Sequence, residues 1–304
     1  MALAVSAPQP AGRFRRRWLL YAGAFLFVAP ALINLLLFRY VPIVSAAYTS
    51  LFQYSLLGGF GAYAGLDQYT RAIEDPLFWT SMRVTALFVL LKVPFQVALA
   101  LGLALLLQRQ MPATALVRTA VFLPVVTALV IASILWQMMY HPQQGLINGL
   151  LSTLGLPRQP FLTDAFQSLP ALVLTTIWKD VGFSMVIFLA GLAGIPEVYY
   201  EAAAIDGAGP RQRFLHITLP LLKRTTLFVM VTTTVFAFQV FTPVYIMTRG
   251  GPLDATKVIV YYIYQNAFAF NDMGYASALS LVVLFLILAV SLGQMWLMRG
   301  EHEY

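Results

Sequence analysis

Residues 201–220 read EAAAIDGAGPRQRFLHITLP and lie between two long apolar runs of a 304-residue chain. The stretch opens on the triplet EAA, a glycine follows after three residues, and the pair LP closes it. The pattern is EAA-x3-G-x9-I-x-LP, with fixed positions Glu201, Ala202, Ala203, Gly207, Ile217, Leu219 and Pro220. An ordinary amphipathic linker between two spans is the alternative interpretation of this stretch.

The local chemistry of this stretch predicts two short helices joined by a turn. Residues 199–206 are good helix formers with small alanines on one face. Gly207 and Gly209-Pro210 interrupt that helix, because glycine accepts positive φ and proline favours a turn or the first position of a helix. A second short helix is expected from Arg211 to Ile217, ending before Pro220. Such a helix–turn–helix is suited to docking in a groove of another protein.

The chain as a whole has the composition of a polytopic membrane protein, with 60% hydrophobic and 10% charged residues. Six apolar runs are long enough to cross a hydrocarbon core of about 30 Å, which takes about 20 residues each. They lie near residues 18–38, 84–107, 116–139, 169–192, 226–248 and 276–298. We therefore predict an all-α membrane protein with six transmembrane helices.

The distribution of basic residues predicts the orientation. With the N-terminus in the cytoplasm, the inside segments hold eleven Lys and Arg residues and the outside segments hold six. Because cytoplasmic loops are enriched in these residues, both termini and the 201–220 loop are expected in the cytoplasm. Residues 1–17 would form a cytoplasmic tail and residues 18–304 the transmembrane domain. The first apolar run is too long for a secretory signal and lacks its cleavage site, so we predict an uncleaved span.

Several function classes have no support in the sequence. The chain has no cysteine, its three histidines are scattered, and no GxxxxGK[ST] run for cradling phosphates occurs. We expect no metal site, no bound cofactor and no catalytic residues. The net charge of +7 follows from the predicted orientation and needs no nucleic acid to explain it.

The EAA pattern and most of the chain resemble the carbohydrate-type permease subunits of binding-protein-dependent ABC importers. Residues 65–85, 118–148, 177–203 and 248–280 are similar to their connections and spans. Residues 188–208 and the Gly-Gly-Pro at 250–252 resemble the F-type subunit of maltose importers and the A-type subunit of glycerol-3-phosphate importers. The resemblance implies the type I importer permease fold, with a cytoplasmic EAA coupling loop near residues 197–220.

The resemblance also implies partners, a location and a role for the loop. It implies a heterodimer with a second permease, two ATPase subunits that hold ATP and Mg, an external solute-binding protein and a sugar-like solute. The location would be the cytoplasmic membrane of a bacterium or archaeon. Contact with the ATPase is expected from Glu201, Ala202, Ala203, Asp206, Gly207, Ile217, Leu219 and Pro220. Glu201 would pair with a basic residue of the ATPase.

Ionisable residues within the predicted spans point to a solute path, because such residues usually face a bundle interior or a wet cavity. Lys179 and Asp180 lie near the middle of the fourth predicted span, and Lys92 lies in the second. Helical spacing places polar and aromatic side chains together on one face of the fourth predicted span and on one face of the fifth. This mixture of side chains suits a sugar. The predicted solute contacts are Thr176, Lys179, Asp180, Phe183, Phe236, Gln239 and Val240. As alternatives, Lys179 and Asp180 could pair with the partner permease, and Lys92 could extend to the membrane interface.

One structural alternative and three rival functions remain open at this point. The aromatic residues Tyr261, Tyr262, Tyr264, Phe268 and Phe270 fit packing or an interfacial belt better than a ligand platform. A secondary, ion-coupled transporter is the main rival function, although coupling-ion sites and repeated halves are not evident. A membrane enzyme and a non-catalytic scaffold or channel are the other rivals.

Overall fold

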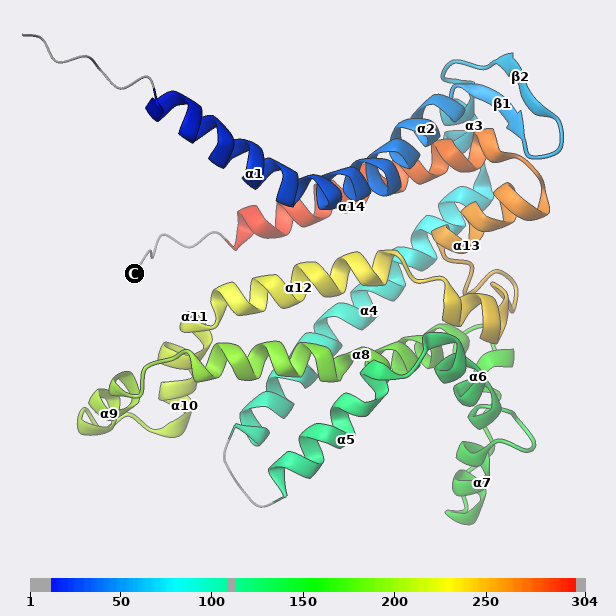
Figure 1. The fold of residues 1–304 in the computed structure, drawn as a ribbon. Coiled ribbons are helices and arrows are strands. Elements are labelled where there is room, and N and C mark those ends of the chain that lie inside the picture. Colours follow the sequence, from blue (N-terminus) through cyan, green and yellow to red (C-terminus); the bar gives the residue numbers. More distant parts are fainter. Residues whose placement is uncertain (1–11, 109–112, 299–304) are drawn as a thin grey trace, which may run out of the picture.

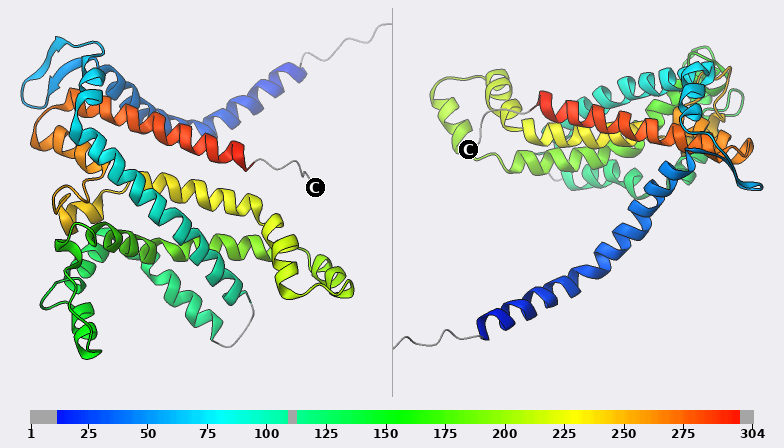
Figure 2. Two further views of the ribbon diagram at one scale, coloured as in Figure 1. Left: turned by 180° about the vertical axis from the view of Figure 1, so that it is seen from behind. Right: turned by 90° about the horizontal axis from the view of Figure 1, so that it is seen from above.

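The computed structural model describes residues 12–108 and 113–298, so most of the predicted tail 1–17 lies outside the described residues. A long first helix consists of α1 (Gly12–Leu35), the π-helical turn η1 (Leu36–Tyr40) and α2 (Val41–Thr49). It therefore continues beyond residue 38, the end predicted from hydropathy. Its first part extends away from the other helices (Figure 2), and large apolar side chains such as Phe27 and Phe38 are exposed.

A small β-hairpin follows and is an exception to the predicted all-α architecture. Strands β1 (Phe52–Ser55) and β2 (Gly59–Tyr63) pair in antiparallel fashion, with Phe52 opposite Tyr63. Gly59, the first residue of β2 after the turn, has φ +72°, a conformation that favours glycine. The rings of Phe52, Phe60 and Tyr63 pack on one another, and α3 (Asp67–Glu74) follows.

Helices α4 and α8 form the centre of the molecule. They span Pro76–Leu107 and Ser168–Ala193, and their contact surface contains the fully buried Phe88, Met185 and Phe188. Helix α8 also packs against α5 (Thr114–Val126). At this crossing Gly182 is required by close approach, because an added Cβ would lie 2.4 Å from the carbonyl oxygen of Val121.

The third predicted span is broken. Helices α5 and α6 (Leu129–Met139) meet at an angle of 103°, so 116–139 is not one continuous helix. Pro124 removes a backbone donor, and three β-branched residues follow it, which disfavours helix continuation. Thr127 and Ala128 are accordingly extended. Helix α7 (Leu146–Thr153) and the short 3-10 helix η2 (Phe161–Thr163) come next.

The fifth predicted span, 226–248, is interrupted as well. Helix α12 (Lys223–Phe238) ends before Gln239, and the chain resumes as the π-helical turn η4 (Val244–Thr248) after Pro243. Helix α13 (Ile259–Tyr264), the π-helical turn η5 (Gln265–Ala269) and α14 (Met273–Leu297) complete the chain. Proline preferentially begins a helix, and here it separates two helical segments.

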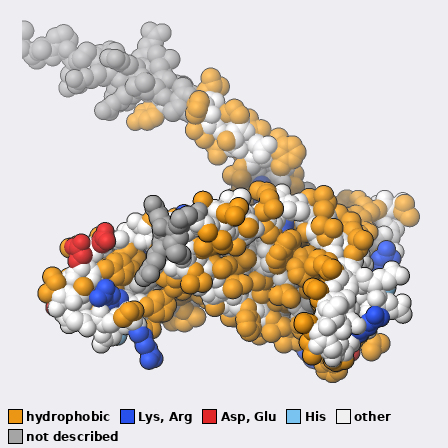
Figure 3. Space-filling model, turned by 90° about the horizontal axis from the view of Figure 1, so that it is seen from below, with side chains coloured by type: hydrophobic (Ala, Val, Ile, Leu, Met, Phe, Trp, Pro, Cys, Tyr) orange, Lys and Arg blue, Asp and Glu red, His pale blue; other side chains and the backbone are white. Residues whose placement is uncertain are grey.

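The elements have a clear polarity (Figure 1). The short helices of the EAA loop lie at one end, and the hairpin, α7 and α13 lie at the other. Among the described residues, four helices are long and apolar enough to cross a membrane, or up to six segments if each of two bent helix pairs counts as one span. Between the ends the surface is broadly hydrophobic, with Lys and Arg gathered near both ends (Figure 3).

We expect Gly182→Ala to destabilise the protein by about 1–3 kcal/mol, because the methyl group would force α8 away from the α5 backbone. Gly102→Ala is the matched control, since no atom lies within 4 Å of a Cβ built there. Alanine also favours a helix over glycine by about 1 kcal/mol. Thermal unfolding of the detergent-purified variants tests the difference. Equal unfolding temperatures for both variants would contradict the close-approach argument.

Candidate coupling loop and solute path

The EAA loop forms the predicted helix–turn–helix. Helix α9 (Val198–Ile205) ends at Asp206, and Gly207 has the expected positive φ of +77°. The second helical segment consists of α10 (Pro210–Arg213), the π-helical turn η3 (Phe214–Thr218) and α11 (Leu219–Leu221). The prediction that this helix ends before Pro220 is wrong. A π-helical turn precedes the proline, so Pro220 lies in the first turn of α11, where its missing N–H is tolerated.

Hydrogen bonds within the loop fix its two helices relative to each other. The hydroxyl groups of Tyr200 and Thr218 lie 3.0 Å apart and connect α9 with η3. Across the turn, Arg213 Nε donates to the carbonyl of Ala208 at 2.8 Å. The backbone N–H of Gly209 donates to Gln212 Oε1, also at 2.8 Å. The loop can therefore move as a rigid unit.

The predicted contact residues of the loop lie mostly on its surface. Glu201, Ala202 and Asp206 are exposed, as are Leu219 and Pro220, while Ala203 and Ile217 are half-buried. Within the described residues the Glu201 carboxylate has no hydrogen-bond or ion-pair partner. An unpaired carboxylate beside small alanine side chains leaves a surface that another protein could approach closely.

Two of the predicted solute contacts point into neighbouring structure. Lys179 is buried, and its Nζ donates at 2.8 Å to the carbonyl oxygen of Val125, beside the break between α5 and α6. Thr176 is also buried, and its hydroxyl donates to the carbonyl of Val173 in its own helix. Each polar group thus already has a hydrogen-bond partner within the chain.

Asp180 pairs within the chain. Its Oδ2 lies 2.7 Å from Lys92 Nζ on α4, and the lysine side chain is only 3% exposed. Lys92 therefore does not extend to the membrane interface, the alternative favoured from sequence. One helical turn further on, Gln96 Nε2 donates to Ser184 Oγ at 3.0 Å. On each helix the two polar residues lie four positions apart. This spacing was the only signal in the sequence for the two polar contacts between α4 and α8.

Three of the four remaining predicted contacts have exposed side chains, and the fourth is buried. Phe183 is 42% exposed and Phe236 is 57% exposed, and Gln239 is also exposed at the end of α12. Val240 is buried. The structure thus divides the predicted set into a buried part, which holds the helices together, and an exposed part on α8 and α12.

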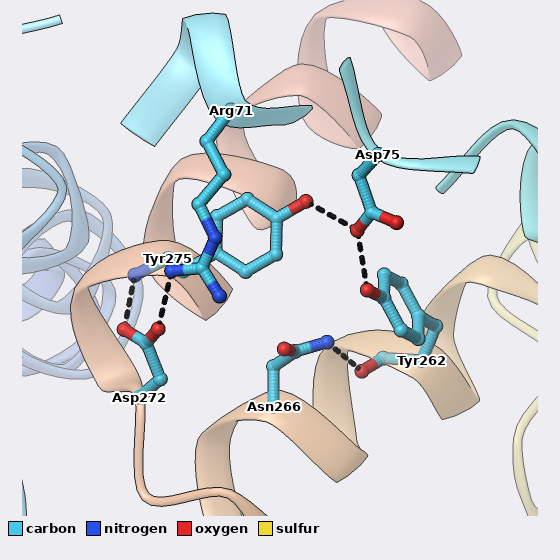
Figure 4. Close-up of polar contacts among 6 residues, drawn as sticks. All are labelled: Arg71, Asp75, Tyr262, Asn266, Asp272 and Tyr275. Carbon is cyan, nitrogen blue, oxygen red and sulfur yellow. Dashed lines mark hydrogen bonds and ion pairs between the residues drawn. The ribbon is translucent and has the colours of Figure 1, made fainter. Parts of the chain in front are cut away.

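A polar cluster at the opposite end of the molecule was not predicted (Figure 4). Asp75, the N-cap of α4, accepts hydrogen bonds from the hydroxyls of Tyr262 and Tyr275, the latter at 2.8 Å. Arg71 pairs with Asp272 at 2.6 Å, and its guanidinium lies 4.0 Å from the centroid of the Tyr275 ring. These contacts tie α3 and the start of α4 to α13 and α14.

Electrostatics in this cluster favour an ionised Asp75. Burial raises the pKa of the Asp75 carboxyl, but the tyrosine hydroxyls and backbone N–H groups lower it further, so the net shift is downward. Burial and the hydrogen bond to Asp75 raise the pKa of Tyr262 to about 12. The phenol therefore remains a donor at neutral pH.

Two depressions also lie at this end. One of about 630 Å³ is lined by hairpin, α3 and loop residues, including Gln53, Gln68, Arg71, Asn271 and Asp272. Another of about 440 Å³ is lined by residues that include Tyr140, His141 and Thr248. None of the predicted solute contacts lines either depression.

The mostly helical membrane fold and the exposed EAA loop place the chain in the class of transport permeases. Residues 11–300 match the model of the binding-protein-dependent transport system inner membrane component, and the chain belongs to this family. The chain is therefore a permease subunit of an ABC importer, a transport component rather than an enzyme.

Relatives and a solved structure agree with this assignment. The chain is 36% identical to the probable ABC transporter permease YurN of Bacillus subtilis, over 92% of this chain and 97% of YurN. It is 37% identical to the sulfoquinovosyl glycerol permease SmoG of Agrobacterium fabrum (88% and 87%). It is 34% identical to the lactose permease LacF of Rhizobium radiobacter (91% and 94%). A bacterial alginate ABC transporter, solved with an alginate-loaded periplasmic protein, matches with a TM-score of 0.82 and 26% identity, over 95% and 96% of the chains.

We expect Asp180→Asn to destabilise the protein, because Lys92 would remain buried without its counter-charge. Removing one partner of a buried ion pair costs about 3–5 kcal/mol, and partial exposure of Asp180 favours the lower end. The double variant Lys92→Met with Asp180→Asn should recover most of the loss. Thermal unfolding in detergent measures both effects. A single variant as stable as the native protein would show that the pair contributes little.

Proposed function

We propose that this chain is one half of a heterodimeric permease that imports a sugar or sugar-like solute, driven by two separate ATPase subunits that bind ATP and Mg. The observation that carries the proposal is the exposed, unpartnered Glu201 carboxylate on an internally hydrogen-bonded loop. A carboxylate without a partner on a rigid loop is well placed to form an ion pair with a basic residue of another protein. An ion-coupled secondary transporter is not supported, since the family match is to a binding-protein-dependent system.

The packing of the helices supports a route for the motion. The EAA loop joins α8 to α12, so a displacement of the loop acts on both helices directly. Helix α8 is held to α4 by the Lys92–Asp180 pair and to α5 by the bond from Lys179 to Val125. ATP-driven closure of the ATPase would thus move α4, α5 and α8 together, which is the rigid-body change that alternating access requires.

The exposed part of the predicted solute face supports a sugar as the solute. Phe183 and Phe236 offer apolar ring surface, and the amide of Gln239 can donate to and accept from hydroxyl groups. A solute path of this kind would be completed by the second permease. The solute would arrive on an external binding protein, as in the solved alginate complex.

Reconstitution tests the proposal. The permease pair, the ATPase and the binding protein encoded with this chain are placed in proteoliposomes. Uptake is then measured with lactose, maltotriose, arabinotriose, sulfoquinovosyl glycerol and the acyclic polyol mannitol. ATP-dependent uptake of a ring-containing sugar is expected. Uptake without ATP, or uptake of none of the ring-containing sugars, would contradict the proposed function.

Glu201→Ala should reduce ATP-dependent uptake at least tenfold without reducing the amount of permease in the membrane, because the carboxylate has no hydrogen-bond or ion-pair partner among the described residues. Glu197→Ala is the matched control, since Glu197 is an exposed carboxylate in the same loop but outside the EAA pattern. Uptake and ATPase retention on purification are measured together. Normal uptake by Glu201→Ala would remove this residue from the coupling contact.

The orientation has its own test. Leu253 and Ile205 are 94% and 88% exposed at opposite ends of the molecule, and the chain contains no native cysteine. With both termini cytoplasmic, Leu253→Cys should react with an impermeant thiol reagent added to intact cells that express the importer. Ile205→Cys should react only after the membrane is opened. The reverse labelling would place the EAA loop outside and exclude its contact with a cytoplasmic ATPase.

A further inference from the structure

Five aromatic rings form a continuous cluster at the end of the molecule opposite the EAA loop, and we call it the aromatic platform. Its members are Phe241, Tyr245, Tyr261, Tyr264 and Phe268. Phe241 and Tyr245 are stacked, with centroids 5.4 Å apart and an interplanar angle of 24°. Tyr264 lies 5.1 Å from both Phe241 and Phe268, and 5.4 Å from Tyr245. Two segments that are distant along the chain thus build one aromatic surface.

Two π-helical turns and a glycine with positive φ position these rings. Tyr245 lies in the π-helical turn η4, and Phe268 lies in the π-helical turn η5. Such turns are rare and occur frequently at functional sites. Behind the platform Gly250 has φ +84°, and a Cβ there would lie 2.9 Å from Tyr261 Cε1. The glycine therefore allows the chain to pass directly behind the Tyr261 ring.

One side of the platform packs against the hydrophobic core, and the other side is exposed. Tyr261 is only 6% exposed and packs in the main hydrophobic core. Phe241 and Tyr264 are half-buried, whereas Tyr245 is 42% exposed and Phe268 is 58% exposed. The outer faces of Tyr245 and Phe268 are therefore accessible to a ligand. The neighbouring Tyr262 differs, because its hydroxyl is engaged by Asp75.

We propose that the aromatic platform binds a ring of the solute by stacking, as an outer site ahead of the α8–α12 face. The proposal rests on the proposed function and deepens it, since it selects solutes that contain a sugar ring. The apolar C–H face of a pyranose or furanose ring fits against an aromatic face, and phenol groups at the edge can exchange hydrogen bonds with its hydroxyls. Phe241 follows Gln239 by two residues, so the platform continues the candidate solute path outward.

The test uses the complete importer and the ring-containing sugar that the native importer takes up fastest among those above. Tyr245→Ala and Phe268→Ala should each lower the uptake rate about three- to tenfold, a loss that corresponds to ~0.7–1.4 kcal/mol. Tyr245→Phe keeps the ring and should retain most of the rate. Phe270→Ala is the matched control, because Phe270 is 64% exposed yet belongs to none of the ring contacts.

A second measurement detects contact without relying on transport. Tyr245→Trp keeps an aromatic ring and places a reporter on the platform. Its tryptophan emission should shift when the same sugar is added without the binding protein, whereas mannitol should cause no shift. A merely structural role of the ring would not produce a response that depends on the sugar.

Distinct results would overturn the inference. An unchanged emission with the sugar, or uptake by both alanine variants at the native rate, excludes stacking while leaving the proposed function intact. An equal loss in Phe270→Ala indicates an interfacial belt, and loss of complex assembly in both alanine variants indicates packing against another chain. If the native importer takes up no ring-containing sugar, the proposed function itself fails, and the platform proposal fails with it.

Discussion

Hydrocarbon offers no hydrogen-bond partner to a peptide group, so each interruption of a spanning helix must be satisfied by the protein itself. This constraint explains where the polar side chains of the chain lie. Lys179 donates to the carbonyl of Val125 where α5 ends. Gln137 on α6 donates to the carbonyls of Ile246 and Met247 in the π-helical turn η4. The breaks are tolerated because neighbouring helices supply the missing donors.

The same contacts limit how the molecule can move. A lysine that bridges α8 to the end of α5, together with the Lys92–Asp180 pair, makes sliding between these helices costly, because charged groups would lose their partners in a dry environment. Movement relative to these helices is therefore expected at the 65° bend between the end of the EAA loop and α12. Coupling therefore requires that α4, α5 and α8 move as one rigid unit and that the chain bends outside this unit.

Features that depend on neighbours in sequence could be predicted, and features that depend on distant partners could not. The EAA helix and the positive φ at Gly207 follow from local residue types, and the structure confirms both. The breaks in the third and fifth spans could not be read from hydropathy, since apolar residues continue through them. The Lys92–Asp180 pair joins residues 88 positions apart, so no local pattern could establish it. The Asp75 cluster was missed for the same reason.

The sequence left a choice for Asp180 between a structural pair and a solute contact, and the geometry makes these roles compatible. Lys92 binds one carboxylate oxygen, Oδ2, and the side chain remains 37% exposed. A carboxylate accepts several hydrogen bonds, so a pair on one side leaves acceptor capacity on the other. A carboxylate held in place by a buried lysine is better positioned to accept from a hydroxyl donor than an unpaired side chain would be.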